Sequence, residues 1–365
     1  MKHMKKVLTI LLVLAMVLSI AACGKSGDKK EEPKKEGTEQ KATKNKIKVG
    51  MVTDIGGIND RSFNETSWKG LEAFKAETGN EITYVESAQA SDYVKNINTI
   101  VDQDVNFVWG IGYALGGDIE TVAKQNPNVH FATVDWAYGT DKDGKQIEIP
   151  KNLTGVMFKA QEPSFLVGYI AGLTTETNKI GFVGGQKGFI IDQFEYGFRA
   201  GVKEAAKELG KEITVEVQYA ESFQDAAKGK GIASKMYAGG ADIVFHAAGG
   251  VGIGVIEAAK EADKKVIGVD MDQSHLAPKH VLTSALKRVD FATKDLSTKL
   301  ANGEEIGGKN FVYGLKEGGV GIPAMPEKDA VIKKEVYDKA IAKQQEIIDG
   351  KIVPPFNEET WKAYK

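Results

Sequence analysis

The chain has 365 residues and a formal net charge of −2 at pH 7, from 48 basic and 50 acidic side chains. This near-neutral balance gives no reason to expect a nucleic-acid partner, which a strongly basic chain would suggest. Cys23 is the only cysteine, and this excludes an intrachain disulfide.

The first 22 residues have the features of a secretory signal peptide. Met1–Lys6 carries three lysines, and Val7–Ala22 is apolar or small except for Thr9 and Ser19. This run is short for a membrane span, which needs about 20 residues. The sequence Ile-Ala-Ala-Cys that ends at Cys23 resembles a bacterial lipobox, in which the cysteine is diacylated and becomes the mature amino terminus. A signal peptide in which this cysteine is incidental is the alternative.

Residues 23–46 are expected to form a disordered tether behind the lipidated Cys23. Gly24–Lys46 holds eight lysines, four glutamates and one aspartate, and it has no aromatic residue. Such a segment cannot bury enough apolar surface to fold. Its lysines would lie over anionic lipid headgroups. We therefore expect a protein that is held on the outer face of the cell membrane by a lipid anchor.

Five short apolar runs in the first half of the remaining chain predict strands, and helical patterns lie between them. Tyr93–Val101 and Gly117–Lys124 are examples of the intervening helices. This alternation is typical of βαβ units around a parallel sheet. The expected strands are Ile47–Thr53, Ile82–Glu86, Phe107–Gly110, His130–Asp135 and Leu153–Phe158.

The second half repeats this rhythm, so the chain from Ile47 onward predicts an α/β protein of two Rossmann-like lobes. Each lobe would contain a parallel sheet, with a cleft between the two. The expected strands are Lys179–Gly184, Ile213–Gln218, Ala241–Ala247, Val266–Asp270 and Val281–Leu286. The expected helices are Asp192–Leu209, Ala226–Tyr237, Val251–Ala262 and Val289–Leu300.

The lobe boundaries follow from this repeat. We expect an N-terminal lobe over 47–161 and a C-terminal lobe over 162–290, with Glu162–Thr174 near the crossover. Phe311–Leu315 predicts one more strand, and we expect the chain to return to the N-terminal lobe over about 291–322.

The last segment, 323–365, contains a predicted amphipathic helix over Lys328–Ile348 and a short tail. Its hydrophobic pattern does not indicate which lobe it joins.

The polar loop 54–64 follows the first expected strand and precedes a helical pattern over Glu65–Thr78. Loops at the carboxyl ends of strands are where open α/β sheets bind ligands. A plain helix N-cap formed by Asp60 or Ser62 is the alternative interpretation. The loop concentrates acids, amides, a hydroxyl and an aromatic ring in Asp54, Asn59, Asp60, Ser62, Phe63 and Asn64.

An enzyme would need a nucleophile with its base, a metal cluster or a cofactor loop. The five histidines show no metal-ligand spacing, and we interpret His130 and His246 as residues of the sheets. Gly184–Gly188 lacks the spacing of a phosphate loop, and Gly249–Gly254 lacks that of a dinucleotide fingerprint. The sequence therefore does not support catalysis, a cofactor or a metal.

Polar and aromatic residues at strand ends in both halves favour ligand binding instead. Asp135 ends one strand of the first half, Val266–Asp272 ends in two acids, and Lys287 ends the last strand of the second half. Phe63 and Phe223, one from each half, could hold a planar ring between them. Carboxylates suit ribose hydroxyls because one acid can accept from two adjacent donors. For each residue alone, helix capping or ordinary packing remains the alternative.

Six motifs occur in an order that resembles a known family. They are D-x-G-x-x-x-D-x-S-F-N at 54–64, F-A-T-V-D at 131–135, S-F-x-D at 222–225, A-A-G-G-x-G at 247–252, G-V-D-x-D-Q at 268–273 and T-S-x-x-K-R at 283–288. Over Ile47–Pro354 the chain resembles the basic membrane protein family of substrate-binding lipoproteins, which includes purine nucleoside receptors. The resemblance implies a periplasmic-binding-protein type I bilobe with a hinge.

The resemblance also implies eight ligand-binding residues. They are Phe63 and Phe223 stacking on a base, Asp54 and Asn64 at the base edge, Gly249, Asp272 and Lys287 at the ribose, and Asp135 as a further acid of the cleft. Whether Gly249 or Gly250 contacts the ligand stays open at this point.

The resemblance, together with these residues, leads us to expect a non-enzymatic, monomeric lipoprotein that binds nucleosides and delivers them to the permease and ATPase of an ABC importer. Purine nucleosides are the favoured ligands. A binder of another small ligand, such as a sugar or a signalling molecule, is the main alternative. An enzyme or a surface adhesin is the third.

Overall fold

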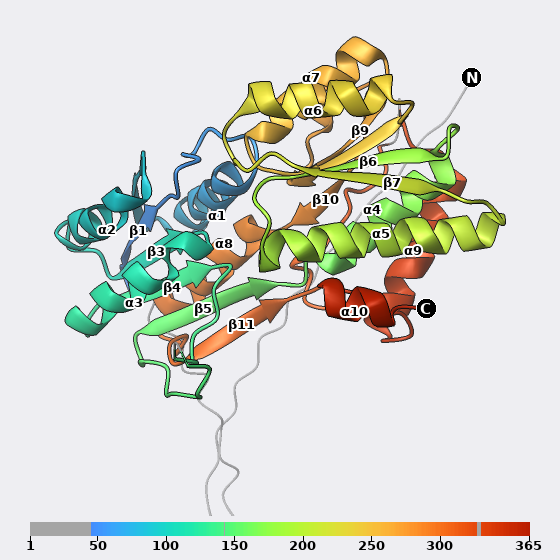
Figure 1. The fold of residues 1–365 in the computed structure, drawn as a ribbon. Helices are drawn as coiled ribbons and strands as arrows, with labels where there is room; N and C mark the ends of the chain where they lie inside the picture. The colour runs from blue at the N-terminus through green and yellow to red at the C-terminus, as the bar shows by residue number, and fades with distance from the viewer. Residues whose placement is uncertain (1–44, 142, 327–329) are drawn as a thin grey trace, which may run out of the picture. The chain divides into compact units, whose positions relative to one another are not determined.

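The computed structural model describes residues 45–141, 143–326 and 330–365 (Figure 1). The expected signal peptide over 1–22, Cys23 and the tether up to residue 44 lie outside the described residues. Asn45 is already joined to the folded body, because its backbone N–H donates to the carbonyl oxygen of Ala301 at 2.8 Å. Among the described residues, no helix has both the length and the apolar character that crossing a bilayer requires.

The first lobe is built on a six-stranded parallel sheet in the order β11-β5-β4-β3-β1-β2. Its strands are β1 (Lys48–Val52), β2 (Glu81–Val85), β3 (Phe107–Ile111), β4 (His130–Val134), β5 (Leu153–Phe158) and β11 (Lys309–Tyr313). Its helices are α1 (Phe63–Thr78), α2 (Tyr93–Val101), α3 (Gly116–Gln125) and α8 (Val289–Ala301), with short 3₁₀ turns at Ala90–Asp92 and Tyr113–Leu115.

Both faces of this sheet are buried, which explains why its strands are continuous apolar runs. Along β1, Val49 and Met51 pack with α1 and α8, whereas Val52 packs with α2 and α3. Successive side chains of a strand point to opposite faces, so one short segment contributes to two cores. Helix α1 is capped at its carboxyl end by Gly79, which has a left-handed backbone (φ +66°) and whose N–H donates to the carbonyl oxygen of Lys75.

The second lobe repeats the architecture with the sheet order β12-β10-β9-β8-β6-β7. Its strands are β6 (Lys179–Gly184), β7 (Thr214–Tyr219), β8 (Ile243–Ala247), β9 (Lys265–Asp270), β10 (Val281–Lys287) and β12 (Val320–Gly321). Its helices are α4 (Gln161–Thr174), α5 (Phe189–Leu209), α6 (Ala226–Ala238), α7 (Val251–Ala262), α9 (Lys334–Ile348) and α10 (Glu358–Ala363), with a 3₁₀ turn at Ser274–Leu276. Helices α4, α5 and α9 pack on one face, and α6 and α7 on the other.

The fold confirms the expected α/β bilobe, and every expected strand has a counterpart. One element differs: β12 pairs antiparallel with β10, so the chain re-enters the second lobe by Val320, inside the range expected for the first. Two residues are too short a run to be visible as a strand in the sequence.

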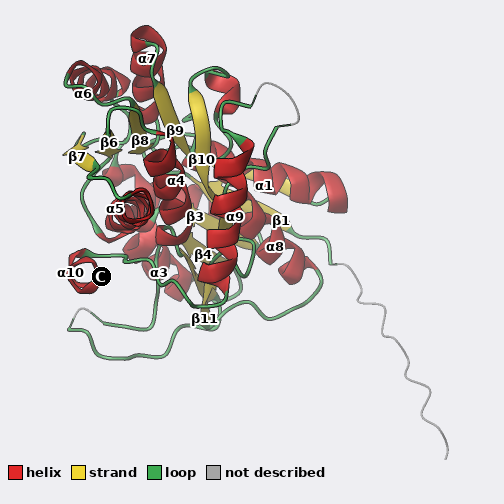
Figure 2. Ribbon diagram, turned by 90° about the vertical axis from the view of Figure 1, so that its right-hand side faces the viewer, coloured by secondary structure: helices red, strands yellow, loops and turns green. Residues whose placement is uncertain are grey.

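The carboxyl-terminal segment joins the second lobe. Helix α9 lies beside α4 (Figure 2), and Val336 and Ala340 belong to the core of this lobe. This helix begins at Lys334, six residues after the predicted start at Lys328. Helix α10 packs on α5, where the Arg199 guanidinium lies 4.5 Å from the ring centroid of Trp361.

Three chain segments connect the lobes: β5 to α4, β10 to α8, and β11 to β12. They bond to one another. The backbone N–H of Leu315 donates to Glu162 Oε2 at 2.7 Å, and the N–H of Arg288 donates to the carbonyl oxygen of Gly319 at 2.8 Å. These bonded crossings are where a hinge between the lobes is expected.

Candidate functional site

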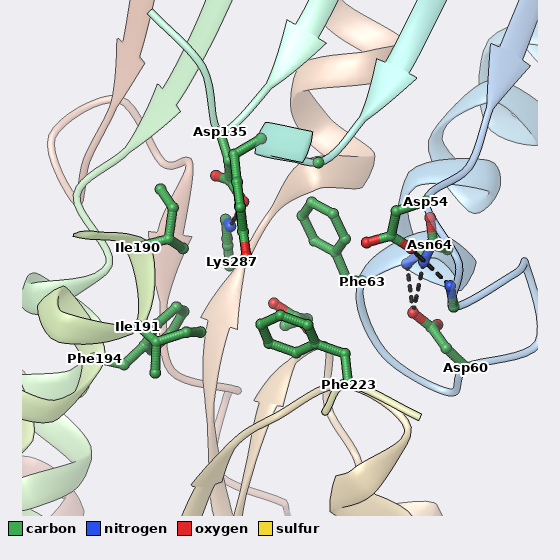
Figure 3. Close-up of a pocket in the computed structure, with 15 residues that line it drawn as sticks. Asp54, Asp60, Phe63, Asn64, Asp135, Ile190, Ile191, Phe194, Phe223 and Lys287 are labelled. Atoms are coloured by element: carbon green, nitrogen blue, oxygen red, sulfur yellow. Dashed lines mark hydrogen bonds and ion pairs between the residues drawn. The ribbon is translucent and has the colours of Figure 1, made fainter. Parts of the chain in front are cut away.

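A pocket lies between the lobes, at the carboxyl ends of strands from both sheets (Figure 3). It contains about 580 Å³ of empty space, including its open mouth. The place agrees with the rule that open α/β sheets bind ligands beyond their strand ends.

Two aromatic rings enter the pocket from different lobes. Phe63, the first residue of α1, and Phe223, in the loop after β7, both extend into it and are half-buried (Figure 3). The ring of Phe223 packs closely on Gly185: a Cβ atom there would come within 2.2 Å of Cε1 of Phe223. Ile190, Ile191 and Phe194 of α5 supply an apolar wall.

At one end of the pocket, Asn64 is held by two carboxylates. Its Nδ2 donates to Asp54 Oδ1 at 2.8 Å and to Asp60 Oδ2 at 3.1 Å. This fixes the amide, and it leaves Asn64 Oδ1 buried without a hydrogen-bond partner. Asp54 Oδ1 also accepts from the backbone N–H of Gly56. Burial raises the pKa of Asp54 to about 6, against the opposing effects of these two hydrogen bonds.

The sequence offered Asp60 or Ser62 as the N-cap of α1, and the structure shows that Asp60 is the one that caps it. Its carboxylate accepts from the backbone N–H groups of Ser62, Asn64 and Glu65 at 2.9, 2.8 and 3.1 Å. The Ser62 hydroxyl makes no capping bond and instead donates to Asp270 in the second lobe. Capping and pocket formation therefore occur in the same loop.

At the other end, Lys287 forms a buried ion pair across the lobes. Its Nζ donates to Asp135 Oδ2 at 2.5 Å, and the two side chains are 2% and 5% exposed. The same ammonium lies 4.7 Å from the ring centroid of Phe63. Asp135 Oδ1 is buried without a partner. Lys287 is the only cation lining this pocket in the described part of the chain.

Asp270 is the acid of the second lobe in the pocket. It ends β9 as Asp135 follows β4, and both residues have φ +66°. Asp and Asn tolerate this left-handed conformation better than most residues. Burial raises the pKa of Asp270 to about 7, although Lys287 and the Ser62 hydroxyl act in the opposite direction.

The structure brings together seven of the eight ligand residues implied by the resemblance: Asp54, Phe63, Asn64, Asp135, Phe223, Gly249 and Lys287. It does not bring Asp272 to them. Asp272 is exposed outside the pocket, where its Oδ1 accepts from the backbone N–H of Ser274. Asp270 lies in the pocket instead. Gly249 lines the pocket, and Gly250 does not.

Sequence reasoning missed several lining residues. Tyr113 follows β3, so the strand-end rule would have found it. Ile190 and Ile191 were missed because α5 begins at Phe189 rather than at the expected Asp192. Their apolar character gave no sign that they face a ligand pocket.

His130 and His246 lie where the sequence placed them, in the sheets. His130 begins β4, and His246 in β8 is fully buried. Within the described ranges, no group of three or more His, Cys, Asp or Glu side chains is arranged to hold a metal ion.

The fold is similar to that of a solved ABC transporter system solute-binding protein from Aeropyrum pernix K1. The TM-score is 0.76 at 24% identity, over 87% of this chain and 96% of the other. At this level of identity the likeness supports the fold alone.

Similarity to relatives covers nearly the whole chain. The chain is 42% identical to a CD4+ T-cell-stimulating antigen of Listeria innocua, over 97% of this chain and 99% of the relative. It is 40% identical to the ABC transporter nucleoside-binding protein BmpA of Lactococcus lactis, over 86% and 90%. The family described as "ABC transporter substrate-binding protein PnrA-like" matches residues 47–358. The chain therefore belongs to the Bmp, or basic membrane protein, family of ABC transporter substrate-binding proteins.

Proposed function

We propose that this protein binds nucleosides, with purine nucleosides preferred, in the pocket between its lobes. The observation that carries the proposal is the arrangement of Phe63 and Phe223 between two groups of hydrogen-bonding side chains. A nucleoside has the matching parts: a flat base for the aromatic rings, and polar groups at both ends. The relative from Lactococcus lactis that is named as nucleoside-binding supports this assignment.

At the base end, the available groups are hydrogen-bond acceptors. Asn64 Oδ1 is unpartnered, and the amide cannot turn because its Nδ2 is bonded to two carboxylates. The carboxyl of Asp54, whose pKa is about 6, can accept at neutral pH. These two residues would bind N–H donors on the base edge.

At the ribose end, Asp270, Lys287 and Gly249 would contact the hydroxyl groups. Asp270 takes the role that the resemblance assigned to Asp272, because Asp270 is the acid that lines the pocket. Asp135 would hold Lys287 in place through their ion pair and would offer Oδ1 as a further acceptor.

The charges of the pocket disfavour nucleotides. Asp54, Asp60, Asp135 and Asp270 line it together with a single cation, Lys287, among the described residues. A dianionic phosphate near these acids would be repelled and would lose hydration without compensation. The pocket therefore suits a neutral, donor-rich ligand.

We further propose that the protein is a monomeric lipoprotein anchored through Cys23, which presents nucleosides to the permease and ATPase of an ABC importer. The lipobox-like sequence and membership of a substrate-binding family support this. The Cys23→Ala variant should be unlipidated and lost from the membrane fraction. A Cys23→Ala protein that is still acylated would refute the anchor.

Calorimetry with the purified full chain tests the ligand class. The expected order of affinity is nucleoside, then 2′- or 3′-deoxynucleoside, then free base, with nucleotide last. Each missing hydroxyl leaves buried polar groups unpaired, which costs about 1–3 kcal/mol. Asp270→Ala should reduce the ribose-to-deoxyribose difference more than Asp54→Ala does. A pentose or hexose that binds more tightly than every nucleoside would contradict the proposal.

A further inference from the structure

Gln273 connects the lobes next to the pocket without lining it. Its side chain is almost completely buried (1% exposed), and its Nε2 donates to the backbone carbonyl of Arg61 at 2.9 Å. Arg61 belongs to the first-lobe loop and directly precedes Ser62 and Phe63. Gln273 therefore contacts the segment that positions two residues of the pocket.

The orientation of the Gln273 amide is fixed within the second lobe. The backbone N–H of Val269 donates to its Oε1 at 3.0 Å, and the backbone N–H of Gln273 donates to Ser284 Oγ at 3.2 Å. A reversed amide would place an N–H group against that of Val269 and an oxygen against the Arg61 carbonyl. Only the observed orientation satisfies both neighbours.

His246 also hydrogen-bonds to the side-chain oxygen of Gln273. Its Nε2 lies 3.0 Å from Gln273 Oε1, so this nitrogen must carry the proton and donate. Burial lowers the pKa of His246 to about 4, so the ring is neutral near pH 7 and has one N–H to give. Gly252 of α7 lies against the ring: a Cβ atom there would be 2.0 Å from Cε1 and 2.2 Å from Nδ1.

We propose that Gln273 is an interlobe latch, oriented by His246 and Gly252, that holds the 54–64 loop against the second lobe and slows ligand release. Gln273 and His246 are positioning residues, because they act on the loop and not on the ligand. The latch does not depend on which small ligand the pocket takes. Within the second lobe, Gly252 of α7 packs on His246 of β8, and His246 bonds to Gln273 in the turn after β9.

Gly252→Ala tests the latch without substituting a residue of the pocket, His246 or Gln273. The added methyl group must displace the imidazole, and the donor to Gln273 Oε1 then moves away. The matched control is Gly231→Ala: this exposed glycine of α6 has no heavy atom within 4 Å of an added Cβ. Gln273→Met removes the bond to Arg61 directly.

The readout is amide hydrogen exchange of residues 54–64 in the ligand-free full chain. Gly252→Ala and Gln273→Met should each raise exchange in this loop by about tenfold, as expected for the loss of one buried hydrogen bond. Gly231→Ala should leave it unchanged. Gln186→Leu should also leave it unchanged. Gln186 accepts from the Tyr113 hydroxyl at 3.3 Å, and this interlobe bond does not involve the 54–64 loop.

Two results would overturn the latch. One is unchanged loop exchange in both Gly252→Ala and Gln273→Met. The other is a uniform rise over all strands of the second lobe, which would show that Gln273 only stabilises that lobe. If adenosine binds, its dissociation rate should rise by the same factor in both variants. Failure of adenosine to bind would count against the proposed function, whereas exchange in the free protein judges the latch alone.

Discussion

The two lobes contribute matching acids to the pocket, and these acids differ in their partners. Asp135 follows β4 and Asp270 ends β9, the third strand in each sheet order, and both have φ +66°. Asp135 pairs directly with Lys287, whereas Asp270 accepts from the Ser62 hydroxyl and has a pKa of about 7. The same backbone position thus provides an acid paired with a lysine in one lobe and an acid whose pKa is raised in the other.

This difference suggests two kinds of role. The acid of the first lobe stabilises the buried ammonium, so removing it should affect folding as well as binding. The acid of the second lobe is available to exchange its hydroxyl partner for one from a ligand. The following predictions test this division.

The largest effect is expected from breaking the ion pair. Asp135→Ala leaves Lys287 buried without its partner, and the loss of one member of a buried pair typically costs about 3–5 kcal/mol. Chemical denaturation of the ligand-free protein measures this free energy of unfolding. Asp270→Ala is the matched comparison and should cost clearly less. Equal losses would remove the distinction between the two acids.

Phe63→Ala and Phe223→Ala should each weaken nucleoside binding by about 1–3 kcal/mol, the range for stacking of a base on an aromatic side chain. Each ring comes from a different lobe and is half-buried, so the ligand-free melting temperature should change little. Unchanged affinity together with a large drop in melting temperature would identify the rings as core residues.

The free energy of unfolding should depend on pH because the carboxyl group of Asp270 has a raised pKa. Its folded pKa of about 7 is above the ordinary value of 3.8, so the folded state binds more protons between these values. Its contribution to stability is therefore present at low pH and is lost as the pH rises through about 7. The slope between pH 5 and 6 is at most about 1.4 kcal/mol per pH unit for one group. Asp270→Asn should reduce this slope in denaturation series, and Asp272→Asn should not.

The smallest effect is expected at Asp272. Because Asp272 is exposed outside the pocket, Asp272→Ala should change the free energy of nucleoside binding by less than about 0.5 kcal/mol, as is usual for surface sites. Calorimetry of the two variants, Asp272→Ala and Asp270→Ala, compares their losses of nucleoside affinity. A larger loss at Asp272 than at Asp270 would restore the assignment made from the sequence.

Asp270 and Asp272 also show how far the sequence could lead. The apolar pattern placed both acids at the end of the same strand, but it could not tell which one faces the other lobe. That choice depends on the left-handed turn at Asp270 and on the hydroxyl of Ser62, which is 208 positions away in the chain. Likewise, β12 forms because Val320 pairs with Lys287. The sequence around Val320 contains no pattern that would predict this pairing. The long apolar runs, by contrast, were predictable because burial on both faces leaves a continuous signal.

The position of Lys287 at the end of β10 has a mechanical consequence. Only Arg288 separates it from α8, which belongs to the other lobe, so Lys287 lies at a hinge crossing. Points near an axis of rotation move least, and we therefore expect the pair of Lys287 with Asp135 to persist when the lobes swing apart. An arriving ligand would then meet an ammonium that is already neutralised. The electrostatic free energy of placing a ligand beside Lys287 would then be nearly the same in the open and closed states. Closure of the lobes would therefore be driven by ligand contacts farther from the axis of rotation.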